Sequence, residues 1–404
     1  MSTSLLYHAF GLHGYTYIRQ HFEKGHSYFC VRPNDKLVRC PQCNSYRIIR
    51  RGESERRLRT MPIGTKPTFI LVETPRVQCL SCGCIRRIRL NIATPRCSYT
   101  HAFERYILDL TKLMTLKDIA QWARIGWDTV KEIHKRALKK RYGHPKLGKL
   151  RYLAIDEISV KKGHKYLTLV MDLESGAVVF VGDGKGAKAL EPFWAQLRKT
   201  RAKIQAVSID MSAAYIASVS ENLPGVPLVL DHFHVVNLMN DALTEIRRDL
   251  YRELHDVEER NVLKGTRWIL LKNPENLNLE RDEDKRLQEA LRFNEPLSKG
   301  YYMKEDLRQL WNQPSKRHAE VALNTWITRA QNSGIKPLMR VGKTLDSYRF
   351  GILNWYDHPI TSGPMEGTNN KIKVMKRTAY GYRDIEFFKL RILGIHEAKF
   401  ALTG

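Results

Sequence analysis

The 404-residue sequence lacks any apolar run that approaches the length of a membrane span. Its first residues, MSTSLLYHAFGLHGYTY, are interrupted by His and Gly and precede no small-residue cleavage site. Cysteines number only seven, and an odd count in a chain of this length argues against a secreted disulfide scaffold. Internal repeats and a glycine-rich loop of the nucleotide-binding kind are also missing. We therefore expect a soluble, intracellular protein with no membrane partner and no nucleotide cofactor.

Acidic residues are scarce relative to basic ones. Asp and Glu total 42 against 68 Lys and Arg, so the net charge is +26 at neutral pH. A balance this basic indicates a polyanionic partner, namely DNA, RNA or an anionic membrane, although an inert basic surface is the alternative. The length exceeds what one small core can organise and predicts about two to four domains.

Two Cys-x-x-Cys pairs lie near the start of the chain, Cys40 with Cys43 and Cys79 with Cys82. Each pair places two thiolates on one tight turn, and two such turns form the tetrahedral four-sulfur site that Zn²⁺ prefers. The 35 residues between the pairs exceed the commonest zinc-finger spacing and contain strand-like segments. We predict one structural Zn²⁺ in a ribbon with an inserted hairpin. Reduced buried thiols or a redox pair are alternatives, and Cys84 could replace Cys82.

Arginine is abundant between the two cysteine pairs. A run of charge is usually a solvated face, but beside a zinc ribbon in a chain of net charge +26 we favour contact with phosphates. The candidate DNA-binding residues of this segment are Arg47, Arg50, Arg51, Arg56 and Arg57, and Arg59 belongs to the same cluster.

The next segment, FERYILDLTKLMTLKDIAQWARIGWDTVKEIHKRALKKRYG, shows helical apolar spacing in three pieces. Thr115 is a plausible cap for the second helix and Asp128 for the third, and Gly126 breaks the pattern between them. Two helices, a glycine-containing turn and a further helix are typical of the helix-turn-helix. The basic last helix, with Lys131 and Lys135, would be offered to the major groove of DNA. A generic three-helix spacer is the alternative.

From residue 151 to 232, short runs rich in Val, Ile, Leu and Tyr are bounded by Gly, Asp or Pro and separated by helix-like text. This pattern predicts a mixed sheet with helices on its faces. Two strands finish on a carboxylate, at Asp156 and Asp210, and ligands in such sheets favour the carboxyl ends of strands. A single strand-terminal Asp is usually a turn or cap residue, so neither position is decisive alone.

From His232 onward the text is helical and polar, which predicts an all-helical insertion. It is followed by TSGPMEGTNNKIKVMKRTAYGYR, where a Ser-Gly-Pro turn leads into a helix with Glu366 in its first turn. A carboxylate complements the positive end of a helix there, which is the structural alternative for Glu366. The same helix is rich in side chains that bind phosphates and base edges. They are Asn369, Asn370, Lys371, Lys373, Lys376 and Arg377.

Two strand-borne Asp residues and a helix-borne Glu suit a pair of Mg²⁺ or Mn²⁺ ions, because hard divalent cations bind carboxylate oxygens. Two such ions stabilise the attacking and leaving oxygens of an in-line phosphoryl displacement. Asp156 would bridge the ions, Asp210 would hold one and Glu366 the other. Water would attack first, and a freed DNA 3′-OH could attack second.

The order of zinc knuckles, helix-turn-helix, AIDEIS, SIDMSAAY, DHFH and TSGPMEGTNNKIKVMKRTAYGYR resembles the DDE transposases of bacterial insertion sequences in the group called ISL-three. The resemblance covers nearly the whole chain, and its most specific part is the Ser-Gly-Pro-x-Glu-Gly-x-Asn-Asn frame. It implies an RNase H-like catalytic domain interrupted by the helical insertion. The catalytic and metal-binding triad then maps to Asp156, Asp210 and Glu366, at separations of 54 and 156 residues.

The resemblance also implies a supporting role for Asp231 and His234, which match an Asp-x-x-His signature after the fifth strand; a capped helix start with a satisfied His is the alternative. Glu157, Asp172 and Asp183 are rival carboxylates. The fold class expected is a multidomain α/β protein. Its domains are a zinc ribbon (1–98), a helix-turn-helix (99–149), an RNase H-like mixed-sheet core (150–235), an all-helical insertion (236–357) and a C-terminal catalytic helix region (358–404).

The function implied is a transposase that binds the terminal inverted repeats of its element, cleaves DNA and transfers the strands to a target. Such an enzyme would act on double-stranded DNA in the bacterial cytoplasm, associated with the nucleoid, as a homodimer or higher assembly. Two alternatives stay open. One is a DNA-binding regulator of transposase descent that no longer cuts, and the other is an RNase H-like nuclease or resolvase.

Overall fold

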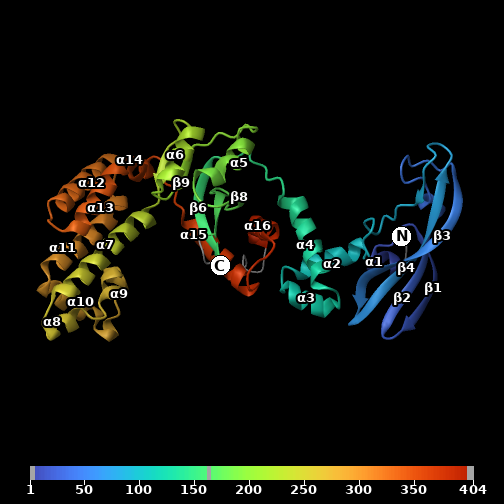
Figure 1. Cartoon of the computed structure of the whole chain (residues 1–404), viewed down its shortest axis with the longest axis horizontal. Coiled ribbons are helices and arrows are strands. Elements are labelled where there is room, and N and C mark those ends of the chain that lie inside the picture. Colours follow the sequence, from blue (N-terminus) through green and yellow to red (C-terminus); the bar gives the residue numbers. More distant parts are fainter. Residues whose placement is uncertain (1–4, 162–164, 398–404) are drawn as a thin grey trace. The chain divides into compact units, whose positions relative to one another are not determined.

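The computed structural model describes residues 5–161 and 165–397, and the chain divides into two compact units (Figure 1). One unit combines Met1–His144 with Val374–Gly404, and the other is Pro145–Lys373. The division falls within the last long helix, α15 (Gly363–Thr378). None of the helices in the described ranges is both long and apolar enough to cross a membrane.

The first unit contains a five-stranded sheet in the order β1-β2-β4-β3, with β5 also paired to β4. The strands are β1 (Tyr15–Glu23), β2 (His26–Pro33), β3 (Ile48–Ile63), β4 (Lys66–Cys79) and β5 (Ile85–Arg87). β3 and β4 form a long antiparallel hairpin whose register pairs Ile48 with Cys79. That register brings the two cysteine pairs, one before β3 and one at the end of β4, to the same end of the hairpin. The short helix α1 (Leu5–Phe10) packs Leu6 and Phe10 into the core of this sheet.

Three helices follow in the same unit, α2 (His101–Leu110), α3 (Leu116–Ala123) and α4 (Trp127–Tyr142). Thr115 caps α3 as predicted, because its side chain accepts from the backbone N–H of Asp118 in a reciprocal capping box. The predicted cap of α4 is wrong: Gly126 occupies the N-cap, and Asp128 lies inside the first turn. There its carboxylate complements the positive end of the helix, which is why it resembles a cap in the sequence.

The C-terminal helix α16 (Ile385–Leu393) packs against α4 within this unit. Phe387 and Leu390 of α16 are buried together with Leu138 of α4. The pairing joins segments about 250 positions apart in the sequence, and local patterning does not reveal it.

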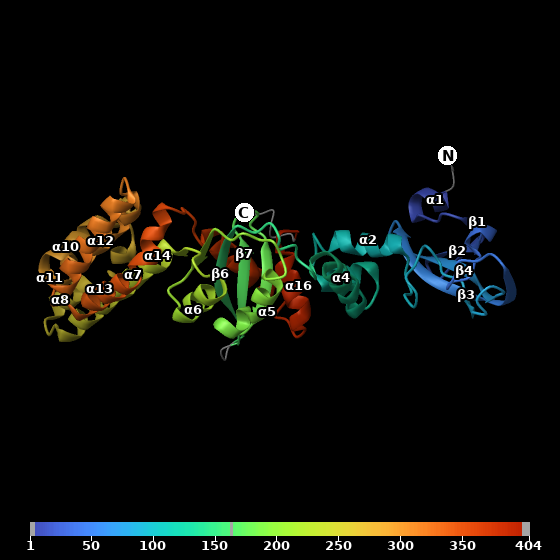
Figure 2. The same ribbon diagram turned by 90° about the horizontal axis from the view of Figure 1, so that it is seen from above.

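The second unit is built on a mixed sheet in the order β10-β9-β6-β7-β8. Its strands are β6 (Tyr152–Lys161), β7 (Lys165–Asp172), β8 (Val178–Asp183), β9 (Ala206–Ile209) and β10 (Leu228–Leu230). β6, β7 and β8 are antiparallel neighbours, whereas β9 pairs parallel with β6 and β10 parallel with β9. Helices α5 (Ala187–Leu197) and α6 (Ala213–Asn222) contact each other and cover one face of the sheet (Figure 2). Gly182 permits this packing, since a Cβ there would lie 2.3 Å from the carbonyl oxygen of Ala189.

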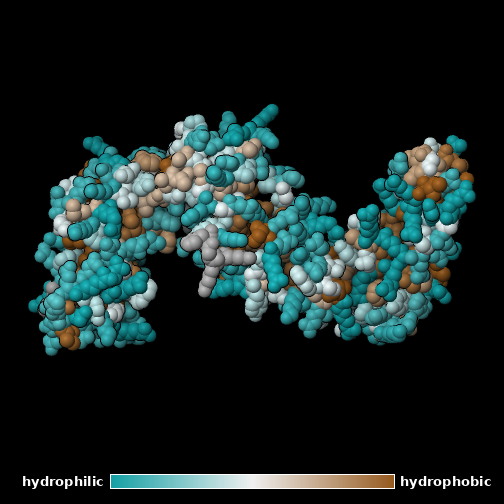
Figure 3. All heavy atoms as spheres, in the orientation of Figure 1, coloured by the Kyte–Doolittle hydropathy of each residue, from teal (hydrophilic) through white to brown (hydrophobic). Residues whose placement is uncertain are grey.

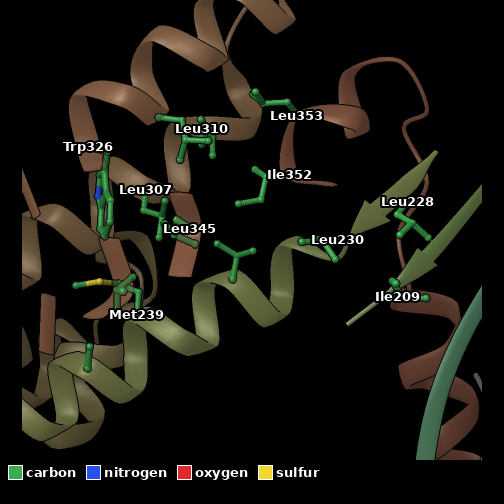
Figure 4. Close-up of a cluster of buried hydrophobic side chains, with 14 of the residues drawn as sticks. Ile209, Leu228, Leu230, Met239, Leu307, Leu310, Trp326, Leu345, Ile352 and Leu353 are labelled. Atoms are coloured by element: carbon green, nitrogen blue, oxygen red, sulfur yellow. The ribbon is translucent and has the colours of Figure 1, made fainter. Parts of the chain in front are cut away.

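A long helix, α7 (His232–Glu253), leaves the end of β10 and opens the predicted helical insertion. The helices that follow are α8 (Val257–Leu263), α9 (Arg267–Leu271), α10 (Glu283–Phe293), α11 (Glu295–Arg308), α12 (Lys316–Gln331), α13 (Lys336–Ser347) and α14 (Arg349–Leu353). One hydrophobic cluster runs from the sheet into these helices, through residues such as Ile209, Leu230, Met239 and Leu345 (Figure 4). The visible face of the insertion is predominantly hydrophilic (Figure 3). The insertion is therefore anchored to the mixed sheet by apolar packing.

Candidate active site and zinc site

Asp156 and Asp210 lie at the same level of two adjacent parallel strands. β6 and β9 pair Ala154 with Ser208, and in each strand the carboxylate follows two residues after the paired residue. Side chains alternate along a strand with a period of two, so the two carboxylates follow the same face. The charge of Asp210 acts directly on Asp156, where it helps to raise the pKa. The sheet thus brings together two acids that the sequence separates by 54 residues.

The rival carboxylate Glu157 points to the other face. Its Oε2 accepts a hydrogen bond of 3.3 Å from the hydroxyl of Tyr215 on α6, the helix that covers that side. The Tyr215 hydroxyl also contacts the buried Thr168 hydroxyl at 3.0 Å. Asp172 accepts from Ser175 and from the backbone of Glu174 in a turn. The third rival, Asp183, is exposed at the end of β8.

Burial raises the pKa of Asp156 above its ordinary value, and the charge of Asp210 raises it further. Three interactions oppose this shift. The backbone N–H of Glu157 donates to Asp156 Oδ1 at 2.7 Å, His234 contributes favourable charge, and Asn369 Nδ2 donates to Asp156 Oδ2 at 2.6 Å. Asp156 is a partly buried acid beside a second acid, which is the environment that a divalent cation relieves.

Glu366 lies in the first turn of α15 and is exposed. It precedes Asn369 by three residues, and residues three apart occupy the same face of a helix. Because Asn369 contacts Asp156, the face of α15 that carries Glu366 is the face toward the acidic pair. Glu366 therefore shares a side of α15 with the residue that contacts Asp156, and its place in the acidic site stays a prediction.

The three carboxylates do not form a single tight cluster. Throughout the described residues, the only group of three or more His, Cys, Asp or Glu ligand atoms within 4.8 Å of one another is a group of four cysteines. Two-metal sites hold their ions about 3.5–4 Å apart, so carboxylates that flank such a pair stand further apart than ligands of one ion. The paired-ion site at these carboxylates stays a prediction.

Asp231 ties the start of α15 to the sheet. It is 3% exposed, follows β10 and caps α7 by accepting from the backbone N–H of Phe233 at 2.9 Å. Its other oxygen accepts from the backbone N–H of Ser362 at 2.9 Å and from the Ser362 hydroxyl. The carbonyl of Ser362 in turn receives the N–H of Glu366 at 3.1 Å. Asp231 thus fixes the turn from which Glu366 projects, through its two contacts with Ser362. In the sequence Ser362 is recognisable only as part of a turn, because its partner Asp231 is 131 positions away.

The four cysteine sulfurs of the predicted zinc ribbon converge. Cys40 Sγ lies 3.6 Å from Cys82 Sγ, and Cys43 Sγ lies 3.5 Å from Cys79 Sγ. In each pair the first sulfur accepts a backbone N–H two residues later, both at 3.4 Å. Hydrogen bonds from the backbone, that of Cys43 foremost, lower the pKa of Cys40 to about 6. Four thiols of this geometry fit Zn²⁺, which binds thiolates at about 2.3 Å in a tetrahedron.

Cys84 is outside this cluster. Its carbonyl accepts the N–H of Cys79 at 2.9 Å and so closes the second turn, while its sulfur is not one of the four ligand atoms. Asn44 and Gly83, each directly after a second cysteine, both adopt positive φ, of 58° and 69°. The two turns therefore have matching backbone shapes, which explains why a Cys-x-x-Cys pair serves in each.

The predicted DNA-binding lysines of α4 face protein rather than open solvent. The side chains of Lys131 and Lys135 are each 19% exposed, and both form ion pairs with Asp384, at 3.5 and 3.0 Å. Lys135 also pairs with Glu386 of α16 at 2.8 Å. Asn369 is likewise engaged within the protein, because it is buried and donates to Asp156. In both cases the partner is far away in the sequence, and the DNA contact stays a prediction.

The other predicted contacts are divided between open and occupied positions. Arg56 is partly buried and donates to the carbonyls of Thr94 and Cys97. Arg50 donates to Asp35 at 2.8 Å, and Arg51 to Gln78 at 2.8 Å, yet both stay exposed. The remaining exposed members are Arg47, Arg57, Asn370, Lys373 and Arg377, whereas Lys371 and Lys376 are half-buried. Their role in DNA binding stays a prediction.

Three family models match the chain in the order that the sequence predicted. A zinc-finger model of the IS204, IS1001, IS1096 and IS1165 transposases matches residues 36–82, a helix-turn-helix model of transposase family ISL3 matches residues 88–138, and a transposase model matches residues 153–392. Zinc ribbon, helix-turn-helix and RNase H-like mixed sheet with a helical insertion are thereby confirmed as the fold class.

Two curated relatives extend along most of the chain. The transposase for insertion sequence element IS1001 of Bordetella parapertussis is 34% identical over 365 residues, which cover 90% of this chain and 89% of the relative. The transposase for IS1557 of Mycobacterium tuberculosis is 31% identical over 382 residues, covering 87% and 84%. Among solved structures, the Drosophila P element transposase strand transfer complex matches 75% of this chain and 92% of that chain, at 12% identity and a TM-score of 0.39, too low to support an argument.

Proposed function

Because the chain belongs to the ISL3 family of transposases, we propose that it binds the terminal inverted repeats of an insertion sequence and cuts the DNA there. The zinc ribbon and helix-turn-helix would hold the end, and the acidic face of the mixed sheet would carry out the chemistry. The observation that supports this most directly is the hydrogen bond between Asn369 and Asp156, which turns the Glu366 face of α15 toward the two strand-borne acids.

We infer that Asp156, Asp210 and Glu366 hold two Mg²⁺ or Mn²⁺ ions, with Asp156 between them. Bound there, the ions would supply Lewis-acid stabilisation of the phosphorane-like charge and favour deprotonation of water. Asn369 keeps one oxygen of Asp156 oriented, and Asp231 fixes the turn before Glu366. Hydrolysis of the phosphodiester would release a 3′-OH, and that hydroxyl would attack a target phosphodiester by transesterification.

Double-stranded DNA is the partner in both steps, first as the transposon end and then as the target. The basic side chains of α15, including Lys373 and Arg377, lie one to three turns beyond Glu366 and suit phosphates on either side of the cut. Two ends must be processed together, so we propose at least a homodimer on DNA.

The test is nicking of a duplex that carries the inverted repeat, in Mg²⁺ or Mn²⁺, followed by detection of joined products. Wild type should nick and join, while Asp210→Asn should lose at least about a thousandfold in rate, since removing a metal ligand costs several kcal/mol of transition-state stabilisation. Asp172→Asn is the matched control, because Asp172 accepts hydrogen bonds within the turn that follows β7. It should retain wild-type activity.

The alternatives are separated by the same assay. Equal nicking by wild type and Asp210→Asn would remove Asp210 from the mechanism. Specific binding without nicking by the wild type would favour the regulator, and nicking without joined products would favour a nuclease or resolvase.

A further inference from the structure

A cleft lies between the tip of the β3–β4 hairpin and the helix-turn-helix, within the first unit. Its volume is about 540 Å³, and its walls include Arg59, Gly64, Tyr106, Trp122 and Arg124. Arg59 belongs to the arginine cluster that the sequence predicts to contact phosphates, whereas the other four residues were not among the predicted DNA contacts. Two of the wall residues are arginines from different modules, one from the ribbon and one from the helical domain.

Arg59 is a buried cation without a carboxylate partner. The residue is 8% exposed, and its guanidinium lies over the rings of Phe69 and Phe103, at 5.1 and 5.6 Å from their centroids. One terminal nitrogen donates to the carbonyl of Ala123 at 3.2 Å, whereas Nε is buried with no hydrogen-bond partner. An unpaired buried donor of a charged group is costly, so a ligand that accepts from it would be strongly favoured.

Arg124 adds a second positive charge to the same cleft. Burial lowers the pKa of Arg59, and the charge of Arg124 lowers it further, so the two guanidinium groups repel each other. In the described part of the chain no hydrogen bond or ion pair engages the Arg124 side chain, and it is exposed. Asp118 also lines the cleft, and its carboxylate accepts from the Thr115 hydroxyl and backbone N–H in the cap of α3. The cleft therefore holds two cations and one carboxylate, and that carboxylate is engaged by the cap of its own helix.

The backbone of Arg124 is unusual as well. It adopts φ 51° and ψ 53° in the turn between α3 and α4, a left-handed conformation that glycine occupies more readily. An arginine at this position stabilises the fold less than glycine would. In return for this loss of stability, the position carries an exposed guanidinium group.

We propose that Arg59 and Arg124 together bind one backbone phosphate of DNA, and that this phosphate fixes the zinc ribbon and the helix-turn-helix in a common register on the duplex. The proposal rests on the DNA-binding function proposed above and adds a site to it. Arginine pairs suit phosphate because their donors form charge-assisted bonds to its oxygens. A phosphate contact in the turn before α4 would also flank the groove that the first turn of α4 enters.

Arg124→Gly is the decisive variant, because it removes the cation and relieves the left-handed backbone. Binding should be measured from 50 to 200 mM salt on a duplex of the terminal repeat and on one of unrelated sequence. We expect the variant to melt no lower than wild type, to bind both duplexes about tenfold more weakly and to lose about 0.9 from the magnitude of the log–log salt slope. Lys112→Ala is the charge-matched control, since Lys112 pairs with exposed Asp109 away from the cleft.

Methylphosphonate substitution at single positions of the duplex identifies the phosphate. At one position the neutral phosphate should weaken wild type by the same factor as Arg124→Gly and should weaken Arg124→Gly no further. The phosphate site in the cleft would be overturned, and the proposed function would stand, if wild type bound DNA and Arg124→Gly kept the wild-type affinity and salt slope. The same conclusion would follow if Arg124→Gly lost no more affinity than Lys112→Ala. A wild type that binds neither duplex would overturn the proposed function and the cleft with it.

Discussion

At the scale of single residues, Asp156 is an acid whose negative charge destabilises the folded state. Burial and Asp210 raise its pKa, so the ionised carboxylate weakens the folded state at neutral pH. The sign follows from the direction of the shift. The penalty is complete above the raised pKa of the folded state and disappears below the ordinary Asp pKa of about 3.9. Sites of this kind exchange stability for function.

We predict that Asp156→Asn melts higher than wild type at pH 7 without divalent ions. The asparagine can still accept from the backbone N–H of Glu157, and the amide of Asn369 can turn to offer its unpartnered Oδ1 to the new NH₂. A gain of the order of 1 kcal/mol would raise the Tm by about 2–4 °C. Thermal melts between pH 4 and 8 should show the difference shrinking toward pH 4.

Magnesium should act in the opposite sense on the same pair of proteins. A cation bound by Asp156 stabilises the folded wild type by an amount that grows with the logarithm of its concentration, so millimolar Mg²⁺ should raise the wild-type Tm and leave Asp156→Asn unchanged. Glu157→Gln is the control, because Glu157 lies on the opposite face against Tyr215. A Tm rise equal in wild type and Asp156→Asn would contradict the metal site at Asp156.

At the scale of elements, the zinc knuckles are the part of the molecule in which sequence and structure agree most closely. Cys40→Ser should reduce the metal content from about one zinc per chain to none, and hydrogen exchange should rise at the knuckle end of β3 and β4, because structural zinc supplies folding free energy directly. Cys84→Ser is the matched control: it is only two residues from a ligand but outside the cluster, so zinc should stay. A folded, zinc-free wild type would contradict the assignment.

Local chemistry explains what could be predicted from the sequence. The Cys-x-x-Cys spacing, the Thr115 capping box and the position of Asp210 directly after β9 are each set by neighbours within a few residues. The mixed sheet follows from the same short-range patterns. These features were correct because the physics that creates them acts over a few residues of the chain. The predicted strand end at Asp156 is wrong, because antiparallel pairing with β7 continues β6 to Lys161 and places Asp156 opposite Leu169.

Long-range partners account for what the sequence did not reveal. The basic sequence of α4 does not reveal that Lys131 pairs with Asp384, more than 200 positions away. Nor does the sequence of α15 reveal that Asn369 donates to Asp156. Arg59 belongs to a local arginine cluster, but its meeting with Arg124 of another module has no local signal. Which face of a helix is covered depends on tertiary packing, and periodicity within the helix cannot supply it.

At the scale of the whole chain, the C-terminal segment returns to the N-terminal unit. α16 buries Phe387 and Leu390 against Leu138 of α4, and its acids pair with the basic side of the same helix. The helix-turn-helix is therefore completed by residues that follow Glu366 in the sequence. A chain cut after α15 would lack this support for α4.

Phe387→Ala should consequently weaken DNA binding although Phe387 contacts neither the DNA nor the acidic site in our proposal. Truncating a phenylalanine that is 2% exposed costs about 3–5 kcal/mol, a loss confined to the first unit. Hydrogen exchange should accelerate in α4 and α16 and stay unchanged in β6 and β9, while DNA affinity falls most at elevated temperature. Phe350→Ala is the control, because that side chain is 44% exposed and belongs to the second unit. If Phe387→Ala left exchange in α4 unchanged, α16 would be a passive tail, and the catalytic half of the sequence would contribute nothing to the DNA-binding half.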